Sequence, residues 1–297
     1  MAEIAVFGLG SMGYGMAASL LRAGHRTYGF DINPQAVEQF VAEGGARGAV
    51  SEVAPRLDAA MVVVLNAAQT ETVLFGEDGL VAHLRPGAVV IACATVPPDF
   101  AREMESEASR AGLHYLDAPI SGGAAKAAEG RLSIMASGSV QAFDGAAPVL
   151  DAMAETVHRL GDSAGAGSAM KAVNQLLAGV HIAAMGEALS FAASQGLDLA
   201  RVLDIIRVSA GTSWMFENRA PHVIEADYTP RSAITIWPKD LGIVTTIAGA
   251  ANLPLPVTEA ALAQYREAAA AGLGAEDDAA ITKHIAARAG VKLPGDG

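Results

Sequence analysis

The stretch IAVFGLGSMGYGM, residues 4–16, decides the fold of the first half of this chain. A short apolar run leads into G-x-G-x-x-G, and a helical pattern then runs from Ser11 to about Arg22. In such a turn the first glycine permits a tight bend, the second lets backbone approach a pyrophosphate, and the third lets helix and strand pack closely. The pattern predicts a dinucleotide-binding turn, and the alternative is a structural turn that binds nothing. The expected cofactor contacts are Gly8, Leu9, Gly10, Ser11, Met12 and Gly13.

A second apolar run, TYGFD, ends in Asp31. An acidic residue at this point binds the ribose hydroxyls of a dinucleotide, and its carboxylate opposes a 2'-phosphate. The next residues, Ile32 and Asn33, offer no guanidinium that could accept such a phosphate. We therefore expect NAD rather than NADP as the cofactor. The alternative is that Asp31 caps the helix that begins near Pro34.

Short β-branched runs alternate with helical patterns from residue 3 to about residue 162, which predicts a parallel sheet with helices on both faces. After Gly167 the chain is rich in Ala and Leu at helical spacing. The expected fold is α/β: a Rossmann-type doubly wound sheet in residues 1–163, then an all-helical domain in 164–297, joined to it by a long interdomain helix. The helices expected in the second half are 168–195, 198–209, 239–251 and 256–271.

The composition argues against several classes of protein. A net charge of -12 disfavours nucleic acid and anionic membranes as partners. The N-terminus has no signal-peptide pattern, and no uninterrupted apolar run is long enough to cross a bilayer. The single cysteine, Cys93, is typical of a small buried hydrophobe in a reducing compartment. The seven histidines lack metal-ligand spacing. We expect a cytoplasmic protein without a metal, nucleic-acid or membrane partner.

Lys171 lies inside GAGSAMKAVNQLL, residues 165–177, whose apolar positions predict a largely buried helix. A lysine that is partly removed from water has its pKa lowered toward neutrality, which suits a general acid or base. Asn174 follows three residues later on the same helix face and could hold a substrate hydroxyl or orient the lysine. The alternative is a lysine that extends from the helix into solvent.

The stretch DAPISGG, residues 117–123, follows a predicted strand. Adjacent amides of Gly122 and Gly123, together with the hydroxyl of Ser121, would form a compact set of donors for a carboxylate. Serine and glycine also populate ordinary turns, so an ordinary strand-to-loop turn is an equally good interpretation of the residues alone.

These motifs resemble, in order and over essentially the whole chain, the β-hydroxyacid dehydrogenase family of the 3-hydroxyisobutyrate and tartronate semialdehyde type. The matching signatures are Gly8-x-Gly10-x-x-Gly13, DAPISGG with Gly130, the series Gly161, Gly165, Gly167, Lys171 and Asn174, and Lys239-Asp240-Leu241. The resemblance implies an all-helical domain that supports a homodimer or homotetramer, and a small hydroxy acid as substrate.

The resemblance also implies the roles of individual residues. Lys171 would be the catalytic acid or base, Asn174 would contact substrate, and Ser121, Gly122 and Gly123 would hold its carboxylate. Lys239 would lie over the NAD cofactor, with Thr95 and the loop of Leu65 and Asn66 beside the nicotinamide or its ribose. The pair Ala94-Thr95 stands where the family usually has Ser-Thr, so only one hydroxyl is present.

Within the family, residues 174–184 and 209–233 most resemble members that oxidise L-threonate, which implies oxidation at C2 to 2-dehydro-L-erythronate. Trp214, Phe216, Asn218 and Arg219 would then form a pocket wall, or else pack between domains. Alternative activities are reduction of tartronate semialdehyde and oxidation of 3-hydroxyisobutyrate. A dinucleotide-binding regulator without catalysis is the alternative from another class.

Overall fold

The computed structural model describes residues 1–296 and divides into two compact units, Met1–Lys171 and Ala172–Gly297. This division falls within the long helix α8 (Ala166–Ser194). The domain boundaries expected from the sequence, 1–163 and 164–297, stay a prediction. Each unit is described by itself below.

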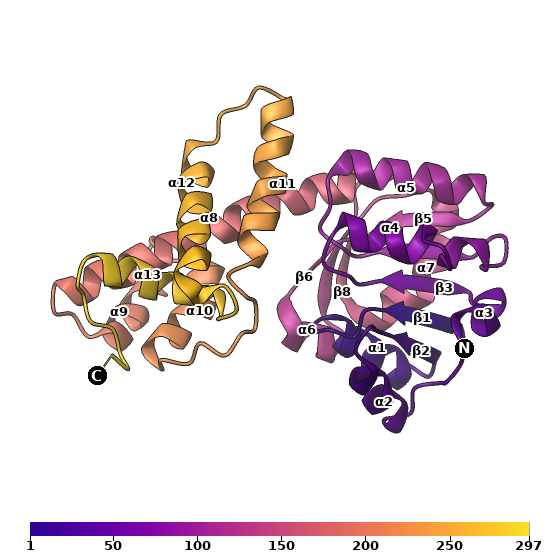
Figure 1. The fold of residues 1–297 in the computed structure, drawn as a ribbon, viewed down its shortest axis with the longest axis horizontal. Helices are drawn as coiled ribbons and strands as arrows, with labels where there is room; N and C mark the ends of the chain where they lie inside the picture. The colour runs from indigo at the N-terminus through magenta and orange to yellow at the C-terminus, as the bar shows by residue number, and fades with distance from the viewer. Residues whose placement is uncertain (297) are drawn as a thin grey trace. The chain divides into compact units, whose positions relative to one another are not determined.

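The first unit is built on a five-stranded sheet in which every neighbouring pair of strands is parallel. The strand order is β2-β1-β3-β4-β5, so the chain crosses over after β2 (Figure 1). This is the doubly wound arrangement that the alternating pattern predicts, and the prediction is confirmed. The strands are β1 (Glu3–Phe7), β2 (Arg26–Phe30), β3 (Ala59–Val62), β4 (Val89–Ala92) and β5 (His114–Asp117).

Both faces of this sheet are buried, because successive side chains of a strand point to opposite faces. Ile4 and Val6 pack in one core with helices α1 and α7, whereas Ala5 and Phe7 pack in the other with α4 and α5. The helices of this unit are α1 (Gly13–Arg22), α2 (Pro34–Ala42), α3 (Val50–Val53), α4 (Ala67–Phe75), α5 (Pro98–Arg110), α6 (Gly123–Glu129) and α7 (Val140–Met153), with 3-10 turns at Ala54–Arg56 and Leu80–Ala82.

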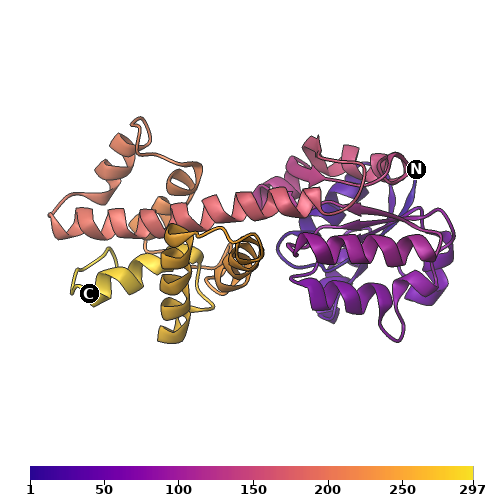
Figure 2. The same ribbon diagram turned by 90° about the horizontal axis from the view of Figure 1, so that it is seen from above.

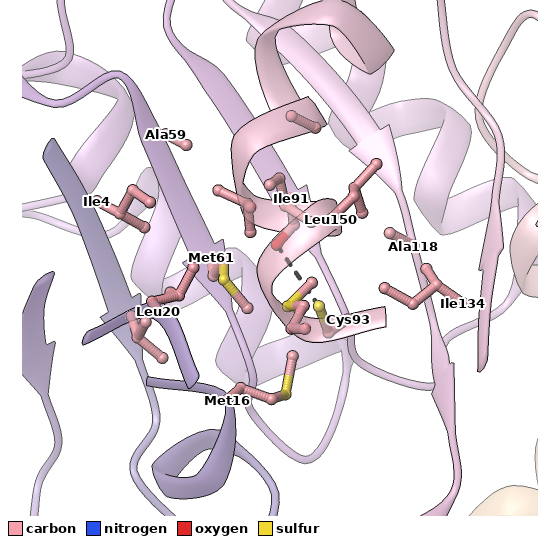
Figure 3. Packing of buried hydrophobic residues seen from close by; sticks show 14 of the residues in the cluster. Ile4, Met16, Leu20, Ala59, Met61, Ile91, Cys93, Ala118, Ile134 and Leu150 are labelled. Atoms are coloured by element: carbon pink, nitrogen blue, oxygen red, sulfur yellow. Dashed lines mark hydrogen bonds between the residues drawn. The ribbon is translucent and has the colours of Figure 1, made fainter. Parts of the chain in front are cut away.

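Figure 3 shows the first of these cores, where Met16 and Leu20 of α1 lie among side chains of the sheet. Cys93 is buried in the same core, and burial raises the pKa of its thiol to about 12. The cysteine therefore packs as a small hydrophobe, as expected, and its thiol stays protonated at neutral pH.

One part of the expected parallel sheet is wrong. Strands β6 (Ile120–Ser121), β7 (Leu132–Ala136) and β8 (Ala154–Arg159) form a separate three-stranded sheet, and β6 runs antiparallel to β7. The connection between β6 and β7 contains only the short helix α6, whereas parallel neighbours need a longer crossover. An antiparallel bridge between Asp117 and Ser137 brings β7 next to the end of β5.

The second unit is helical, as predicted, and its described residues form no extended strand (Figure 1). Its core contains the stacked rings of Trp237 and Tyr265, and the Tyr265 hydroxyl donates to the Gly179 carbonyl at 2.9 Å. The sequence did not predict α10 or α13. The helices after α8 are α9 (Leu199–Ile206), α10 (Trp214–Ile224), α11 (Ile236–Ala250), α12 (Pro256–Ala268) and α13 (Ile281–Arg288), with short helical turns at Ala269–Leu273 and Asp278–Ala280.

Helix α8 is one unbroken element (Figure 2). Among the helices of residues 1–296 it is the one whose length and apolar composition would allow it to cross a membrane, by those two criteria alone. Its residues Ile182, Met185 and Leu189 are buried in the core of the second unit. A core helix passes the same two criteria.

The start of α8 is held by the buried carboxylate of Asp117 at the end of β5. Its Oδ2 accepts hydrogen bonds from the backbone amides of Gly165 and Ser168, both at 2.9 Å, and from the Ser137 hydroxyl at 3.2 Å. Its Oδ1 accepts from the Ser168 hydroxyl at 2.7 Å. Burial raises the pKa of Asp117, and these hydrogen bonds act in the opposite direction. A carboxylate from the sheet thus satisfies amides that the first turn of a helix leaves without partners.

We predict that Asp117→Ala lowers the free energy of unfolding by about 3 kcal/mol, because two buried amides lose their acceptor. Asp117→Asn should cost less than half as much. Its amide oxygen can still accept from both backbone amides, while the Ser168 hydroxyl turns to accept from the new NH2 group. The measurement is urea unfolding followed by circular dichroism.

The matched control for these variants is Asp99→Ala, which removes an exposed ion pair with Arg102 and should cost about 0–1 kcal/mol. An Asp117→Ala protein as stable as the Asp99→Ala protein would contradict the role assigned to the buried carboxylate.

Candidate active site

The glycines at positions 8, 10 and 13 of the first turn have different physical surroundings. Gly8 has a φ of +100°, and a Cβ placed on Gly13 would lie 1.9 Å from the Gly8 carbonyl oxygen. The fold itself therefore requires glycine at both positions. A Cβ placed on Gly10 would meet nothing within 4 Å, and Gly10 is exposed. The space above the Gly10 backbone is therefore open to solvent, and another group can approach that backbone closely.

Helix α1 starts beside this space without a side-chain cap at its N-terminus. Uncapped amides and the positive end of the helix dipole favour an anionic group there. The open space at Gly10 and the uncapped helix together fit the pyrophosphate of a dinucleotide.

Asp31 lies at the end of β2, next to this turn. Its Oδ2 accepts from the Leu9 amide at 2.6 Å, and its Oδ1 accepts from the Asn33 amide at 2.8 Å. Asn33, not Asp31, caps α2 by accepting from the Gln35 amide. The carboxylate is partly exposed and carries further acceptor capacity. Contact between Asp31 and a ribose stays a prediction.

Leu65, Asn66 and Thr95 follow the carboxyl ends of the neighbouring strands β3 and β4, at the edge where ligands of such sheets bind. Leu65 is exposed and its amide donates to the Gln69 side chain at 2.9 Å. The Asn66 side chain caps α4 by accepting from the Gln69 amide at 2.9 Å. Asn66 therefore already has a structural role, and any contact of these residues with a cofactor stays a prediction.

Ser121, Gly122 and Gly123 join β6 to α6. Gly122 and Gly123 have φ angles of +138° and +76°, a pair of conformations that only glycine adopts readily. A Cβ on Gly123 would meet nothing within 4 Å, whereas one on Gly122 would touch Lys126. The turn therefore leaves open space over Gly123, which fits the predicted approach of a carboxylate to its backbone.

The buried side chain of Lys171 has a hydrogen-bond partner inside the first unit. The side chain is 8% exposed, and its Nζ donates to the Ile120 carbonyl oxygen at 2.8 Å. Ile120 directly precedes Ser121, so the amine lies beside the turn that is predicted to hold a carboxylate. The alternative interpretation, in which the lysine extends from the helix into solvent, is therefore wrong.

A chain of polar side chains in the second unit begins at Asn174. Its Nδ2 donates to Gln175 Oε1 at 3.0 Å, and Gln175 Nε2 donates to Asp240 Oδ2 at 2.5 Å. Asp240 Oδ1 lies 2.6 Å from Lys239 Nζ. The sequence singled out Asn174 and Lys239 but gave no role to Gln175 or Asp240. The only signal for these two was their position next to residues already singled out.

Trp214, Phe216, Asn218 and Arg219 are expected from the sequence to form a pocket wall or to pack between domains, and for Phe216 and Arg219 the pocket wall is wrong. Phe216 is buried in the core of the second unit, and Arg219 forms an ion pair with the buried Asp278 at 2.6 Å. Trp214 is exposed. Arg219 supplies the cationic partner that a buried acid such as Asp278 requires.

Within residues 1–296, no group of three or more His, Cys, Asp and Glu side chains could hold a metal ion.

Two family models cover most of the chain. Residues 3–161 match the model described as the NAD binding domain of 6-phosphogluconate dehydrogenase. Residues 165–285 match the model described as NAD-binding of NADP-dependent 3-hydroxyisobutyrate dehydrogenase.

Curated relatives and a solved structure are similar over nearly the full length. The L-threonate dehydrogenase of Cupriavidus necator is 48% identical over 294 residues, which are 99% of this chain and 98% of the relative. That of Escherichia coli is 47% identical over 296 residues, 99% of this chain and 97% of the relative. A crystal structure of 3-hydroxyisobutyrate dehydrogenase from Salmonella typhimurium has a TM-score of 0.91 and 48% identity, covering 96% of this chain and 100% of that chain.

We predict that Gly10→Ala leaves the melting temperature of the nucleotide-free protein within about 2 °C of wild type, because the new methyl group meets no atom of the chain. The same variant should bind NAD at least about tenfold more weakly, since the methyl group would occupy the space predicted for the pyrophosphate. Thermal melting and fluorescence titration with NADH measure the two effects.

Gly13→Ala is the contrasting variant, and it should lower the melting temperature strongly because its methyl group meets the Gly8 carbonyl. Wild-type NADH affinity in the Gly10→Ala protein would exclude the turn as the pyrophosphate site.

Proposed function

The chain belongs to the β-hydroxyacid dehydrogenase family of the 3-hydroxyisobutyrate dehydrogenase type, whose members include NAD-dependent dehydrogenases of small hydroxy acids, and we propose that its own substrate is L-threonate. The product would be 2-dehydro-L-erythronate, formed by oxidation at C2. The observation that supports this substrate is the identity of 48% and 47% to two L-threonate dehydrogenases across the whole length.

Lys171 is the residue we propose as general base in oxidation and general acid in reduction. One hydrogen of its amine is held by the Ile120 carbonyl, which fixes where the nitrogen lies. The amine can then take the hydroxyl proton of the substrate and return it to the carbonyl oxygen in the reverse direction. Burial keeps water from competing for the same proton.

Ser121, Gly122 and Gly123 are the groups we propose for the substrate carboxylate. Gly123 lies under open space, so its amide is accessible to a carboxylate oxygen without a side chain between them. Asn174 is three residues after Lys171 in α8, so both side chains project from neighbouring turns of one helix face. We assign Asn174 to a hydroxyl of the substrate.

NAD is the cofactor, and when bound it supplies the hydride acceptor. The residues that fit it are Gly10 with its open space, the uncapped start of α1, and Asp31 beside the turn. We propose that the Asp31 carboxylate holds the ribose hydroxyls and disfavours the 2'-phosphate of NADP. Lys239, Thr95, Leu65 and Asn66 are proposed around the nicotinamide and its ribose.

3-Hydroxyisobutyrate is the second candidate substrate, because the 48% identical protein of Salmonella typhimurium is described as a dehydrogenase of that acid. The two acids differ chemically: L-threonate carries three hydroxyl groups, and 3-hydroxyisobutyrate carries one hydroxyl and a methyl branch. A comparison of the two as substrates therefore separates the candidates.

The family resemblance also supports two further proposals, that the protein is cytoplasmic and that it forms a homodimer or homotetramer. Light scattering of the purified protein tests the oligomeric state.

We predict that the purified protein reduces NAD with L-threonate, with kcat/KM at least about tenfold higher than with 3-hydroxyisobutyrate, because a site that hydrogen-bonds a hydroxyl rejects an analogue that lacks it. The measurement is NADH absorbance with a panel of hydroxy acids, each with NAD and with NADP, and with tartronate semialdehyde and NADH. NAD should exceed NADP in kcat/KM. Faster turnover of 3-hydroxyisobutyrate or of tartronate semialdehyde would replace L-threonate as the substrate.

We predict that Lys171→Met lowers kcat by about 100-fold to 10,000-fold, the usual contribution of general acid-base catalysis. NADH affinity should stay within about twofold, since the change removes a proton-transfer group and not a proposed cofactor contact. Lys283→Met is the matched control, because Lys283 pairs with Glu276 in the second unit and has no proposed role. Undiminished kcat in the Lys171→Met protein would remove this lysine from the chemistry.

A further inference from the structure

We propose that Gln175 is a positioning residue that fixes the side-chain amide of Asn174, so that Asn174 Oδ1 accepts a hydrogen bond from a second, non-reacting hydroxyl of the substrate. The pair would then select hydroxy acids with a hydroxyl next to the reacting carbon. This inference rests on the proposed substrate contact of Asn174.

The direction of each hydrogen bond follows from the chemistry of Asp240. Its side chain is buried, and its Oδ1 lies 2.6 Å from the Lys239 ammonium, so it is paired as a carboxylate that can only accept hydrogen bonds. Gln175 is also buried and lies 2.5 Å from the other carboxylate oxygen. Gln175 must therefore present its NH2 group to Asp240, because its own oxygen would be repelled there.

The orientation of Asn174 then follows from that of Gln175. With Nε2 donated to Asp240, Gln175 is left with Oε1 on its other side, 3.0 Å from the Asn174 side chain. Only an N–H of Asn174 can meet that oxygen. The amide of Asn174 is thus fixed, and its Oδ1 remains as an acceptor for another group.

The partner of this acceptor cannot be the reacting hydroxyl. A hydroxyl group has one hydrogen, and in oxidation the reacting hydroxyl gives that hydrogen to Lys171. Asn174 Oδ1 is therefore matched to a hydroxyl that keeps its hydrogen. In L-threonate that group is the C3 hydroxyl, next to the reacting C2.

The test compares L-threonate with 2,4-dihydroxybutanoate, which lacks only the C3 hydroxyl, in wild type and in Gln175→Leu. The leucine variant frees the Asn174 amide to rotate. We expect its kcat/KM for L-threonate to fall about tenfold, the value of one hydrogen bond, and that for 2,4-dihydroxybutanoate to change by less than about twofold. An equal loss for both substrates, or no loss for either, would overturn the inference.

An exchange of acid and amide tests the direction of the hydrogen bonds. Gln175→Glu alone places a carboxylate against Asp240 and should lose the selectivity for L-threonate. Combined with Asp240→Asn, the new glutamate accepts from both neighbouring NH2 groups, while the new asparagine keeps an oxygen toward Lys239. The double variant should regain most of the wild-type ratio of the two kcat/KM values. A ratio no higher than that of Gln175→Glu would contradict the assigned polarity.

A readout without substrate uses protein labelled with 15N at its five asparagines. The side-chain NH2 protons of Asn174, assigned by their loss in Asn174→Asp, should exchange slowly in wild type and at least about tenfold faster in Gln175→Leu. Equal exchange in the two proteins would contradict the proposed bond.

Gln264→Leu is the matched control for both readouts, because Gln264 also donates to a carboxylate, that of Glu187, on the surface of the same unit. It should leave the substrate ratio and the Asn174 exchange unchanged. If wild type does not oxidise L-threonate, the proposed substrate fails. The Asn174 exchange still decides the orientation of the amide in that case.

Discussion

The structure of the first unit depends on the buried carboxylate of Asp117. It accepts two amides from the first turn of α8 and thereby sets where that helix starts against the end of β5. Once the start is fixed, helical geometry sets the place of Lys171 one turn later, and the Ile120 carbonyl receives its amine. Asp117 and Ile120 belong to the same short segment as the turn of Ser121, Gly122 and Gly123. One segment therefore supplies the anchor of the helix, the acceptor for the lysine and the proposed carboxylate site.

The sequence predicts those parts of the fold whose cause is local. Glycine spacing gives the first turn, because Gly8 and Gly13 are required by contacts within a few residues and with the next strand. Short β-branched runs that alternate with helical patterns predict the parallel strands, and these runs are continuously apolar because both faces of the sheet are covered. The antiparallel β6 is too short to carry a period, so its direction could not be predicted from the pattern.

The parts of the site that the sequence did not predict depend on residues far apart in the chain. Asp117 meets Ser168 across 51 residues, and Gln175 meets Asp240 across 65. No spacing rule connects such pairs. Asp117 lies in a motif whose predicted role falls on Ser121, Gly122 and Gly123, and Gln175 lies next to Asn174, to which the substrate contact was assigned. For Phe216 the sequence leaves a pocket wall and packing open, because an aromatic residue near polar ones is typical of both, and the structure buries it in the core of the second unit.

The proposed proton-transfer group, Lys171, and the proposed hydroxyl-binding group, Asn174, are held by different hydrogen bonds. Lys171 and Asn174 are about 4.5 Å apart along the axis of one helix, so their spacing is set by the helix alone. Lys171 is held by a backbone carbonyl of the first unit, whereas Asn174 is held through Gln175 by a carboxylate of the second. If Asn174 contacts a substrate hydroxyl as proposed, a change at Gln175 or Asp240 removes its support and leaves the Ile120 acceptor of Lys171 in place. On the proposed roles, the preferred hydroxy acid can therefore change while the proton-transfer group stays constant.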